Sequence, residues 1–388
     1  MKLVNRCGGL VGLNMRARRS LAISFACAFS LVGLSSCASR PETGALLSNT
    51  SVAQGASSHT ILVATTRSRD ARPGTYFDGE RSSALNFASI TVSVPPNHKA
   101  GNVEWPSSKP GNAQTDFVTR DGELLPNDKQ FLAELNQRLK AQPKGQRKVL
   151  LFVHGYNTLF AEGLYRFAQV VHDSHAPSVP VFFSWASHGK TLDYVYDNNS
   201  ATIARDGLER TMRLLLASDA DEINVLAHSM GNWVTVEAFR QIKISGNVTS
   251  AGKLGTVILA APDIDEDVFK SEMQRIGKPK KPFLIIVSRD DKALGLSRFI
   301  AGGKDRIGAS SNTADLANLG AIVVDLSNVK ATDATNHGKF AQIAEMAPDL
   351  RKVLAQGIPD QEEGGLAGAT TRVLTLPIAA PITILTAK

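Results

Sequence analysis

Short, mostly apolar runs alternate with longer segments of helical spacing through the middle of this 388-residue chain. In Phe160–Val171, for example, apolar residues recur every three or four positions after the apolar run Lys148–Val153. Strands without a polar face are typical of parallel sheets covered on both faces. The other apolar runs are His59–Ala64, Ala88–Val94, Val179–Phe183, Ile223–Leu226, Thr256–Ala260, Phe283–Val287 and Ala321–Val324, and the other helical patterns are Asp128–Lys140, Ser200–Ala217, Trp233–Ile242 and Lys339–Leu354. This alternation predicts an α/β fold with a doubly wound, mostly parallel sheet and helices on both faces.

The N-terminus has the pattern of an export signal. Three arginines precede an apolar stretch of 14 residues, Leu21–Leu34, which is shorter than the ~20 residues that span a membrane. The ending Leu-Ser-Ser-Cys resembles the bacterial lipobox, so we expect a lipoprotein-type signal peptide over residues 1–36 and a lipid anchor at Cys37. The protein would then be exported and held in the cell envelope, facing the periplasm. The alternative is a plain secretory signal and a soluble secreted product. Met15 precedes the arginines and offers a second start.

Cysteine and charge counts exclude several classes of function. All three cysteines lie at or before Cys37, so the mature chain would have no thiol for a disulfide, a zinc site or a nucleophile. Five of the 43 basic residues also precede Cys37, whereas no acidic residue does, which leaves 38 Lys and Arg against 36 Asp and Glu. Nucleic-acid binding is therefore not expected. Neither a His-Glu-x-x-His motif nor an acidic calcium loop occurs, so we expect no metal and no cofactor.

Beyond the predicted signal peptide, the composition divides the chain into three parts. Residues 37–58 are rich in Ser, Ala, Gly and Thr without an apolar period, which predicts a flexible tether. Residues 59–355 have the size of one large α/β domain. Within them, the stretch 65–87 contains Arg67, Arg72, Pro73, Gly74 and Gly79 and is predicted to be a loop. Residues 356–388 contain two prolines and are predicted to be a disordered tail or an edge strand.

One serine stands where this fold class places a nucleophile. The apolar run Ile223–Leu226 leads into Ala227-His228-Ser229-Met230-Gly231, after which the pattern becomes helical. This string matches the nucleophile elbow Gly-x-Ser-x-Gly, with Ala227 in the first position. Small residues are needed at both ends because the strand and helix backbones nearly touch there. The non-catalytic interpretation of Ser229 is an ordinary helix N-cap.

The order of residues along the chain points to the partners of this serine. Hydrolases with this elbow follow the order Ser, acid, His, and of the eight histidines only His337 follows Ser229. The acid should follow a strand between them, because it accepts the Nδ1 hydrogen of an imidazole above the sheet. Asp291 is favoured, since it follows the later strand Phe283–Val287, and Asp290 is its rival. Asp263 is the third choice, with a helix N-cap as its alternative role.

An oxyanion hole needs two backbone donors. We predict the amide of Met230, directly after the serine, and the amide of Tyr156 in the turn His154-Gly155-Tyr156-Asn157. His154 is expected to brace this turn and not to act as a base. Three further residues either line the cleft or form a partly buried cluster on a loop, namely Tyr194, Tyr196 and Asp197.

Several of these motifs together resemble a bacterial group of α/β-hydrolases of unknown function that is described as esterase- or lipase-like. They are Ala64-Thr65-Thr66-Arg67, His154–Asn157, Phe183-Ser184-Trp185, Ala227–Gly231, Ala261-Pro262-Asp263 and Ser288–Leu294. The similarity extends from about His59 to Leu354. It implies an α/β-hydrolase fold and assigns the acid to the aspartate before Lys-Ala-Leu, which is Asp291 here. It implies no particular substrate.

Together these patterns predict a serine hydrolase that cleaves a carboxylic ester, lipid esters included, through Ser229, His337, Asp291 and an acyl-enzyme. A thioesterase or a peptidase would use the same groups. A non-catalytic envelope binding protein is the alternative from another class, and loss of the nucleophile or the base would mark it. The expected partners are a small-molecule or lipid ester and a membrane reached through the lipid at Cys37. The sequence does not predict an oligomeric state.

Overall fold

The computed structural model describes residues 43–246, 251–311, 313–331, 333–342 and 383–385. The predicted signal peptide, Cys37 and most of the predicted C-terminal tail lie outside the described residues. Among the described residues, no helix combines the length and the apolar character that crossing a membrane requires.

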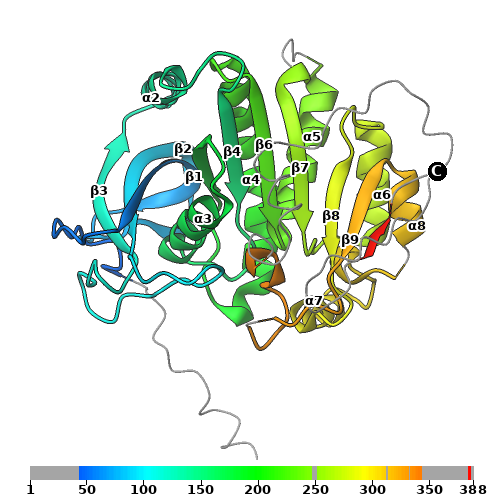
Figure 1. Ribbon diagram of the computed structural model, residues 1–388. Helices are drawn as coiled ribbons and strands as arrows, with labels where there is room; N and C mark the ends of the chain where they lie inside the picture. The colour runs from blue at the N-terminus through cyan, green and yellow to red at the C-terminus, as the bar shows by residue number, and fades with distance from the viewer. Residues whose placement is uncertain (1–42, 247–250, 312, 332, 343–382, 386–388) are drawn as a thin grey trace, which may run out of the picture. The chain divides into compact units, whose positions relative to one another are not determined.

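A ten-stranded sheet forms the centre of the described domain, in the order β10-β9-β8-β7-β6-β4-β5-β1-β2-β3 (Figure 1). The strands from β9 to β1 in this order are parallel to one another, whereas β10, β2 and β3 pair antiparallel at the two edges. The strands are β1 (Ser57–Asp70), β2 (Tyr76–Val94), β3 (Val118–Leu125), β4 (Lys148–Val153), β5 (Ser178–Ser184), β6 (Glu222–His228), β7 (Leu254–Ala260), β8 (Phe283–Val287), β9 (Ala321–Asp325) and β10 (Thr383–Leu385). The mostly parallel sheet is confirmed.

Helices pack on both faces of this sheet, because successive strand residues point into two separate cores. Leu151 and Val153 of β4 belong to the core that also holds α2, α4, α5, α6 and α8, whereas Leu150 and Phe152 belong to the core that holds α3. The helices are α2 (Asp128–Lys140), α3 (Phe160–Ser174), α4 (Tyr194–Ala217), α5 (Met230–Ser245), α6 (Glu266–Ile276), α7 (Lys292–Ile300) and α8 (Thr313–Asn318). This arrangement confirms the predicted doubly wound α/β class with helices on both faces.

The loop predicted over residues 65–87 is wrong. β1 continues to Asp70 and β2 begins at Tyr76, so the two strands form a long antiparallel hairpin around a short turn. Irregularities in the pairing lie on both sides of Arg67. Such bulges break the alternation of side chains on which a strand prediction depends, and for that reason the apolar pattern stops at Ala64.

The domain also begins before His59. Residues 43–56 lie in the predicted tether, but Leu46 is only 1% exposed and belongs to the core around α3. The amide of Asn49 donates to the carbonyl of Thr119 at 2.8 Å, and the Tyr165 hydroxyl donates to the carbonyl of Ala45 at 2.9 Å. The tether prediction therefore needs correction from residue 43 onwards. Two buried apolar residues, Ala45 and Leu46, and a few hydrogen bonds hold this segment, and neither leaves a periodic pattern in the sequence.

Candidate functional site

Ser229 occupies the sharp turn between β6 and α5. Its φ of 53° and ψ of −127° lie in a region that residues other than glycine rarely adopt, at a cost of about 1–3 kcal/mol. Hydrogen bonds hold the turn on both sides, since the Ser229 amide donates to the carbonyl of Ala260 at 3.0 Å and the Ser229 carbonyl accepts from Asn232 Nδ2 at 2.8 Å. This is the strand, turn and helix that the motif Ala227–Gly231 predicts.

Two glycines allow the turn after β4 to lie directly against this elbow. A Cβ on Gly231 would overlap the carbonyl oxygen of His154, and a Cβ on Gly155 would lie 2.7 Å from the Cβ of Ser229. Tyr156, the next residue, lines the same cavity as Ser229. Met230 is the first residue of α5, so its amide has no partner within the helix. The two predicted oxyanion donors therefore lie next to Ser229, Met230 at the start of α5 and Tyr156 in the turn after β4.

His154 braces the turn after β4. Its Nδ1 lies 2.8 Å from the carbonyl oxygen of Gly155, while its Nε2 accepts from the amide of Trp185 at 3.1 Å. Its ring also stacks on Trp185, with the centroids 5.1 Å apart. Burial, and then the charge of Arg67, lower the pKa of His154 to about 3, so the ring is neutral at physiological pH. With both nitrogens engaged inside the protein, His154 has no free atom with which to act as a base.

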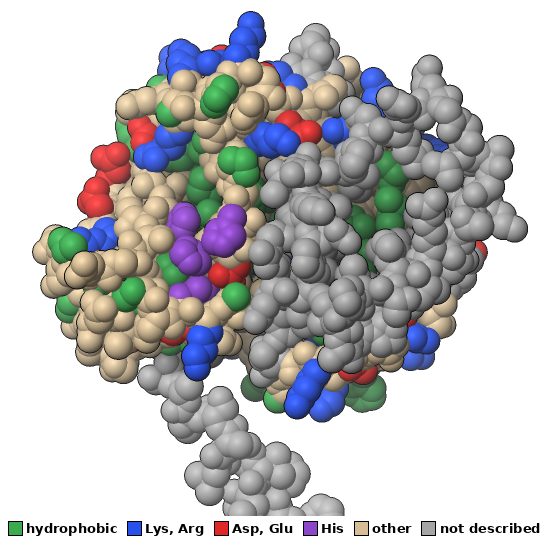
Figure 2. All heavy atoms as spheres, in the orientation of Figure 1, with side chains coloured by type: hydrophobic (Ala, Val, Ile, Leu, Met, Phe, Trp, Pro, Cys, Tyr) green, Lys and Arg blue, Asp and Glu red, His purple; other side chains and the backbone are tan. Residues whose placement is uncertain are grey.

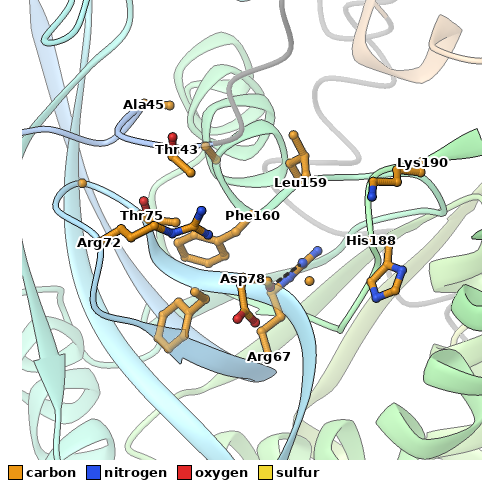
Figure 3. Close-up of a pocket in the computed structure, with 14 residues that line it drawn as sticks. Thr43, Ala45, Arg67, Arg72, Thr75, Asp78, Leu159, Phe160, His188 and Lys190 are labelled. Atoms are coloured by element: carbon orange, nitrogen blue, oxygen red, sulfur yellow. Dashed lines mark hydrogen bonds between the residues drawn. The ribbon is translucent and has the colours of Figure 1, made fainter.

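Arg67 of β1 lies beneath the same turn and is fully buried, with 0% of its surface exposed. It donates to the carbonyl of Asp78 at 2.9 Å (Figure 3). It also donates to the carbonyls of Ser187 at 2.8 Å and Thr158 at 2.7 Å and to Ser184 Oγ at 2.8 Å. Burial lowers the pKa of Arg67 to about 10, so the guanidinium remains charged at neutral pH. One side chain thus ties the β1–β2 hairpin to the segments that follow β4 and β5.

Asp197 of α4 joins the same two segments from the other side. Its carboxylate accepts from the Ser187 hydroxyl at 2.5 Å, from the Asn157 amide at 3.1 Å and from the His188 amide at 3.0 Å. Burial raises the pKa of Asp197 in spite of these hydrogen bonds.

Three residues, Tyr194, Tyr196 and Asp197, were predicted either to line the cleft or to form a cluster. Of these, Tyr194 lines the cavity that contains Ser229. Asp197 is fully buried, and Tyr196 stacks on His188 with the ring centroids 3.5 Å apart.

A cavity of about 460 Å³ lies above Ser229. Its wall contains several apolar side chains, and His337 lies in it together with Ser229. The apolar and aromatic residues are Tyr156, Tyr194, Ala293, Leu294, Leu296 and Ile300. Polar residues in the wall include Asp263, Ser297 and Thr335. The predicted nucleophile and the predicted base therefore face one chamber that is large enough for a small organic molecule.

His337 is paired with Asp291. Nδ1 of His337 lies 2.6 Å from Oδ2 of Asp291, and 17% of the His337 side chain is exposed while none of the Asp291 side chain is. The other oxygen of Asp291 accepts from the Leu294 amide at 3.0 Å and so caps α7. Burial alone would lower the pKa of His337, but the hydrogen bond and charge of Asp291 outweigh it, and the pKa is raised above the usual 6.5.

The other two candidate acids bind different groups. Asp290 lies 2.6 Å from Lys339 Nζ and 2.6 Å from Ser288 Oγ. Asp263 accepts from Ser297 Oγ at 2.5 Å and pairs with Arg306 at 3.3 Å. The N-cap of α6 is Asp265 and not Asp263, because Asp265 accepts from the amides of residues 267 and 268. Of the three carboxylates, Asp291 is the one with a hydrogen bond to His337.

A family model described as an alpha/beta hydrolase of unknown function (DUF900) matches residues 127–356, more than half of the chain. The chain belongs to this family.

Solved structures similar to this α/β hydrolase include fungal and archaeal enzymes. Lipase B from Aspergillus fumigatus has 14% sequence identity and a TM-score of 0.27 over 37% of this chain and 38% of the lipase, so the match spans less than half of that enzyme. An esterase from Rhizomucor miehei has 12% identity and a TM-score of 0.31 over 90% of this chain and 93% of its own. The esterase Pf2001 from Pyrococcus furiosus has 13% identity and a TM-score of 0.24 over 46% and 70%. No curated protein matched.

The loop that carries His337 in this α/β hydrolase is held by residues that sequence reasoning missed. Asp333 accepts from the amide of His337 at 3.1 Å and from that of Gly338 at 2.9 Å. Lys339 is buried and donates to Ser288 Oγ at 2.9 Å and to the carbonyl of Leu326 at 3.0 Å, besides its pairing with Asp290. No motif marks such residues, because they act on the loop and not on a substrate.

Proposed function

We propose that this α/β hydrolase is a serine hydrolase that cleaves carboxylic esters, with Ser229 as nucleophile, His337 as base and Asp291 as the orienting acid. The observation that carries the proposal is the 2.6 Å contact between the buried Asp291 and His337, which lies in the wall of the cavity above the strained Ser229. The family membership supports hydrolysis in general. The arrangement of Ser229, His337 and Asp291 supports hydrolysis through a nucleophilic serine.

In the first half of the proposed reaction, Ser229 Oγ attacks the acyl carbon and its proton passes to Nε2 of His337. Asp291 keeps the Nδ1 hydrogen directed toward itself and stabilises the imidazolium, in keeping with the raised pKa of His337. The amides of Met230 and Tyr156 would bind the oxyanion, and each such donor is worth about 10²–10³ in rate. The intermediate collapses to an acyl-serine, and the leaving alcohol takes the proton from His337.

In the second half, a water molecule enters the place that the alcohol has left. His337 removes one proton from the water, the resulting hydroxyl adds to the acyl carbon, and the same two amides bind the new oxyanion. Collapse releases the carboxylic acid, and the proton on His337 returns to Ser229 Oγ. The cycle consumes one water and needs no other reactant.

The walls of the cavity favour an ester with an apolar portion. Leu294, Leu296 and Ile300 lie along one side of the 460 Å³ cavity. A largely apolar wall suits the apolar portion of an amphipathic ester. Lipid esters are therefore included in the proposed substrate class.

A fluorophosphonate probe tests the nucleophile. We expect the full chain to be labelled covalently and Ser229→Ala to lose labelling and the hydrolysis of p-nitrophenyl esters together. Ser297→Ala is the matched control, because Ser297 lines the same cavity, and it should still be labelled. Equal labelling of Ser229→Ala would disprove the assignment. Faster turnover of a thioester or anilide with the same acyl group than of the ester would indicate that the protein cleaves thioesters or amides instead of esters.

We also propose that the protein is lipid-anchored in the cell envelope through Cys37. The proposal rests on the Leu-Ser-Ser-Cys ending of the apolar N-terminal stretch. Fractionation of cells tests it: the parent chain should sediment with membranes and incorporate a labelled fatty acid, and Cys37→Ser should do neither. Release of both proteins into the soluble fraction would indicate a secreted product instead.

A further inference from the structure

Four of the eight histidines gather at the end of α3, outside the cavity above Ser229. They are His59 of β1, His98 in the loop after β2, and His172 and His175 at the end of α3. Histidine side chains form one patch over the region of α3 in the space-filling view (Figure 2). The mechanism proposed above uses none of them.

Two of these histidines and one carboxylate bring potential metal ligands together. One ligand atom from each of His98, His172 and Asp173 lies within 4.8 Å of the other two. Nε2 of His98 is 2.9 Å from Oδ1 of Asp173, and the rings of His98 and His172 are 5.2 Å apart and nearly perpendicular. Asp173 is buried and only 6% of the His98 side chain is exposed, whereas His172 is partly exposed. A small ion would therefore reach the cluster from the side of His172.

Neighbouring groups hold the second polar atom of each of these three side chains. Nδ1 of His98 is 2.7 Å from Oε2 of Glu104, and Nδ1 of His172 is 3.2 Å from Nε2 of His59. The remaining oxygen of Asp173 accepts from the Gly101 amide at 2.7 Å and from Gln169 Nε2 at 2.5 Å. This is the pattern by which proteins orient metal ligands, with a carboxylate or another acceptor on the far nitrogen of each imidazole.

We propose that His98, His172 and Asp173 bind a divalent transition-metal ion such as zinc. Two imidazoles and one carboxylate form a ligand set that zinc accepts, with the fourth position left to water. Oxygen-seeking ions such as magnesium and calcium are disfavoured, because two of the three ligands are nitrogens. The ion would take the place of the proton between His98 Nε2 and Asp173 Oδ1, and binding would release that proton to solvent.

The position of the cluster predicts a structural role. His98 lies in the loop that follows β2, whereas His172 and Asp173 belong to α3, so one ion would join two segments that are 74 residues apart in the sequence. Gln169, which holds Asp173, also donates to the carbonyl of Ala341 at 3.3 Å. We therefore expect metal binding to raise the melting temperature with increasing ion concentration.

Titration calorimetry and metal analysis test the site on the untagged full chain after dialysis against a chelator. Zinc chloride should bind at one ion per chain and raise the melting temperature, whereas magnesium chloride should do neither. His172→Gln should weaken zinc binding at least 100-fold. His59→Gln, which alters the neighbour of a ligand, should weaken it by about 10- to 100-fold.

His188→Gln is the matched control, because His188 also lies between two carboxylates, Glu80 and Asp193, but has no second histidine as a ligand partner. It should bind zinc like the parent chain. His175→Gln tests whether zinc binds instead between His172 and His175, whose rings are in contact. In the proposed site, His175 is not needed for zinc binding. The proposal fails if the parent chain binds no zinc, if His172→Gln binds as tightly as the parent, or if His175→Gln abolishes binding while Asp173→Asn does not. Circular dichroism of each variant shows whether a loss reflects unfolding.

Discussion

The two halves of the proposed active site are held together by different kinds of contact. The nucleophile half, comprising Ser229 and the turn after β4, depends on backbones that approach so closely that Gly155 and Gly231 have no room for a Cβ. The histidine half, comprising Asp291 and the loop around His337, depends on side chains, above all Lys339 and Asp333. A substitution that adds atoms should therefore disturb the nucleophile half, and a substitution that removes a charge should disturb the histidine half.

The positions of the two halves in the sheet account for this difference. The nucleophile half follows β4 and β6, which are neighbours in the middle of the sheet. The histidine half follows β8 and β9, which lie toward the β10 edge. Because β4 and β6 pair directly, the turns that follow them lie next to each other. His337 lies 12 residues beyond the end of β9 at Asp325, so its loop needs bonds of its own.

The largest expected effect is that of Asp291→Asn. We expect kcat/KM for an ester to fall about 10⁴-fold, because the imidazole loses the partner that fixes its tautomer. His337 must be neutral to accept a proton, so activity rises as pH increases through its pKa, which Asp291 raises above 6.5. The acid limb of the pH profile should thus lie above pH 6.5 in the parent chain and move to lower pH in the variant.

Asp290→Asn is the matched control for that variant, since Asp290 is adjacent and binds Lys339 and not His337. Its loss of activity should be far smaller, and its acid limb should stay in place. A larger loss in Asp290→Asn than in Asp291→Asn would reverse the assignment of the acid.

Gly155→Ala tests the nucleophile half by adding one carbon. The new Cβ would lie 2.7 Å from the Cβ of Ser229, so the turn that carries Tyr156 must move away. We expect kcat to fall about 10²–10³-fold through loss of one oxyanion donor, with little change in KM. Gly252→Ala has nothing within 4 Å of the added carbon and should keep full activity. Parent-like kcat in Gly155→Ala would show that the close contact is not needed.

Lys339→Met tests the histidine half by removing one charge at similar length. Ser288 and the carbonyl of Leu326 would lose a donor, and each buried group left without a partner costs about 1–3 kcal/mol. Urea denaturation should show this loss of stability, and kcat should fall because the loop of His337 loosens. Lys140→Met, on an exposed residue of α2, should change neither. Unchanged stability in Lys339→Met would remove the proposed difference between the halves.

Glu272→Gln lies outside both halves and should have the smallest effect on activity. Burial, and then the neighbouring Glu237, raise the pKa of Glu272 to about 9. Its protonated form therefore favours the folded state fully below pH 4.5, and this contribution is lost as pH rises toward 9. The amide should raise the melting temperature at pH 8 relative to the parent, by about 2–4 °C per kcal/mol, and leave it nearly unchanged below pH 4.5. An equal shift of the melting temperature at both pH values would show that Glu272 is not protonated in the folded parent protein.

The fold could be predicted from the sequence wherever periodicity was strong. β4, β8 and α2 have the predicted bounds, because their apolar patterns are uninterrupted. β3, α6 and α7 were missed, since the middle of β3 is polar at the edge of the sheet and the two helices bury only a few residues each. The nucleophile turn has a motif, whereas the choice among Asp263, Asp290 and Asp291 depends on distances in space.

Residues that support the site were beyond sequence reasoning for a related reason. The sequence does not distinguish a buried arginine such as Arg67 from an exposed one. The partners of Arg67 are mostly backbone carbonyls, which every residue possesses. The same holds for the histidines around α3, which come from β1, from a loop and from a helix. Spacing along the chain carries no trace of such clusters, because the topology assembles them.

Arg67 also has a consequence for where this enzyme can be cut. The family match begins at residue 127, after β1, β2 and β3, and a fragment that started there would contain Ser229, Asp291 and His337. It would lack the guanidinium under the turn after β4 and would expose the edge of β5 that β1 now covers. Uncovered edges of sheets pair with other chains. A fragment trimmed to the matched segment should therefore aggregate. It would keep the proposed catalytic residues but lose Arg67 and β1, which support them.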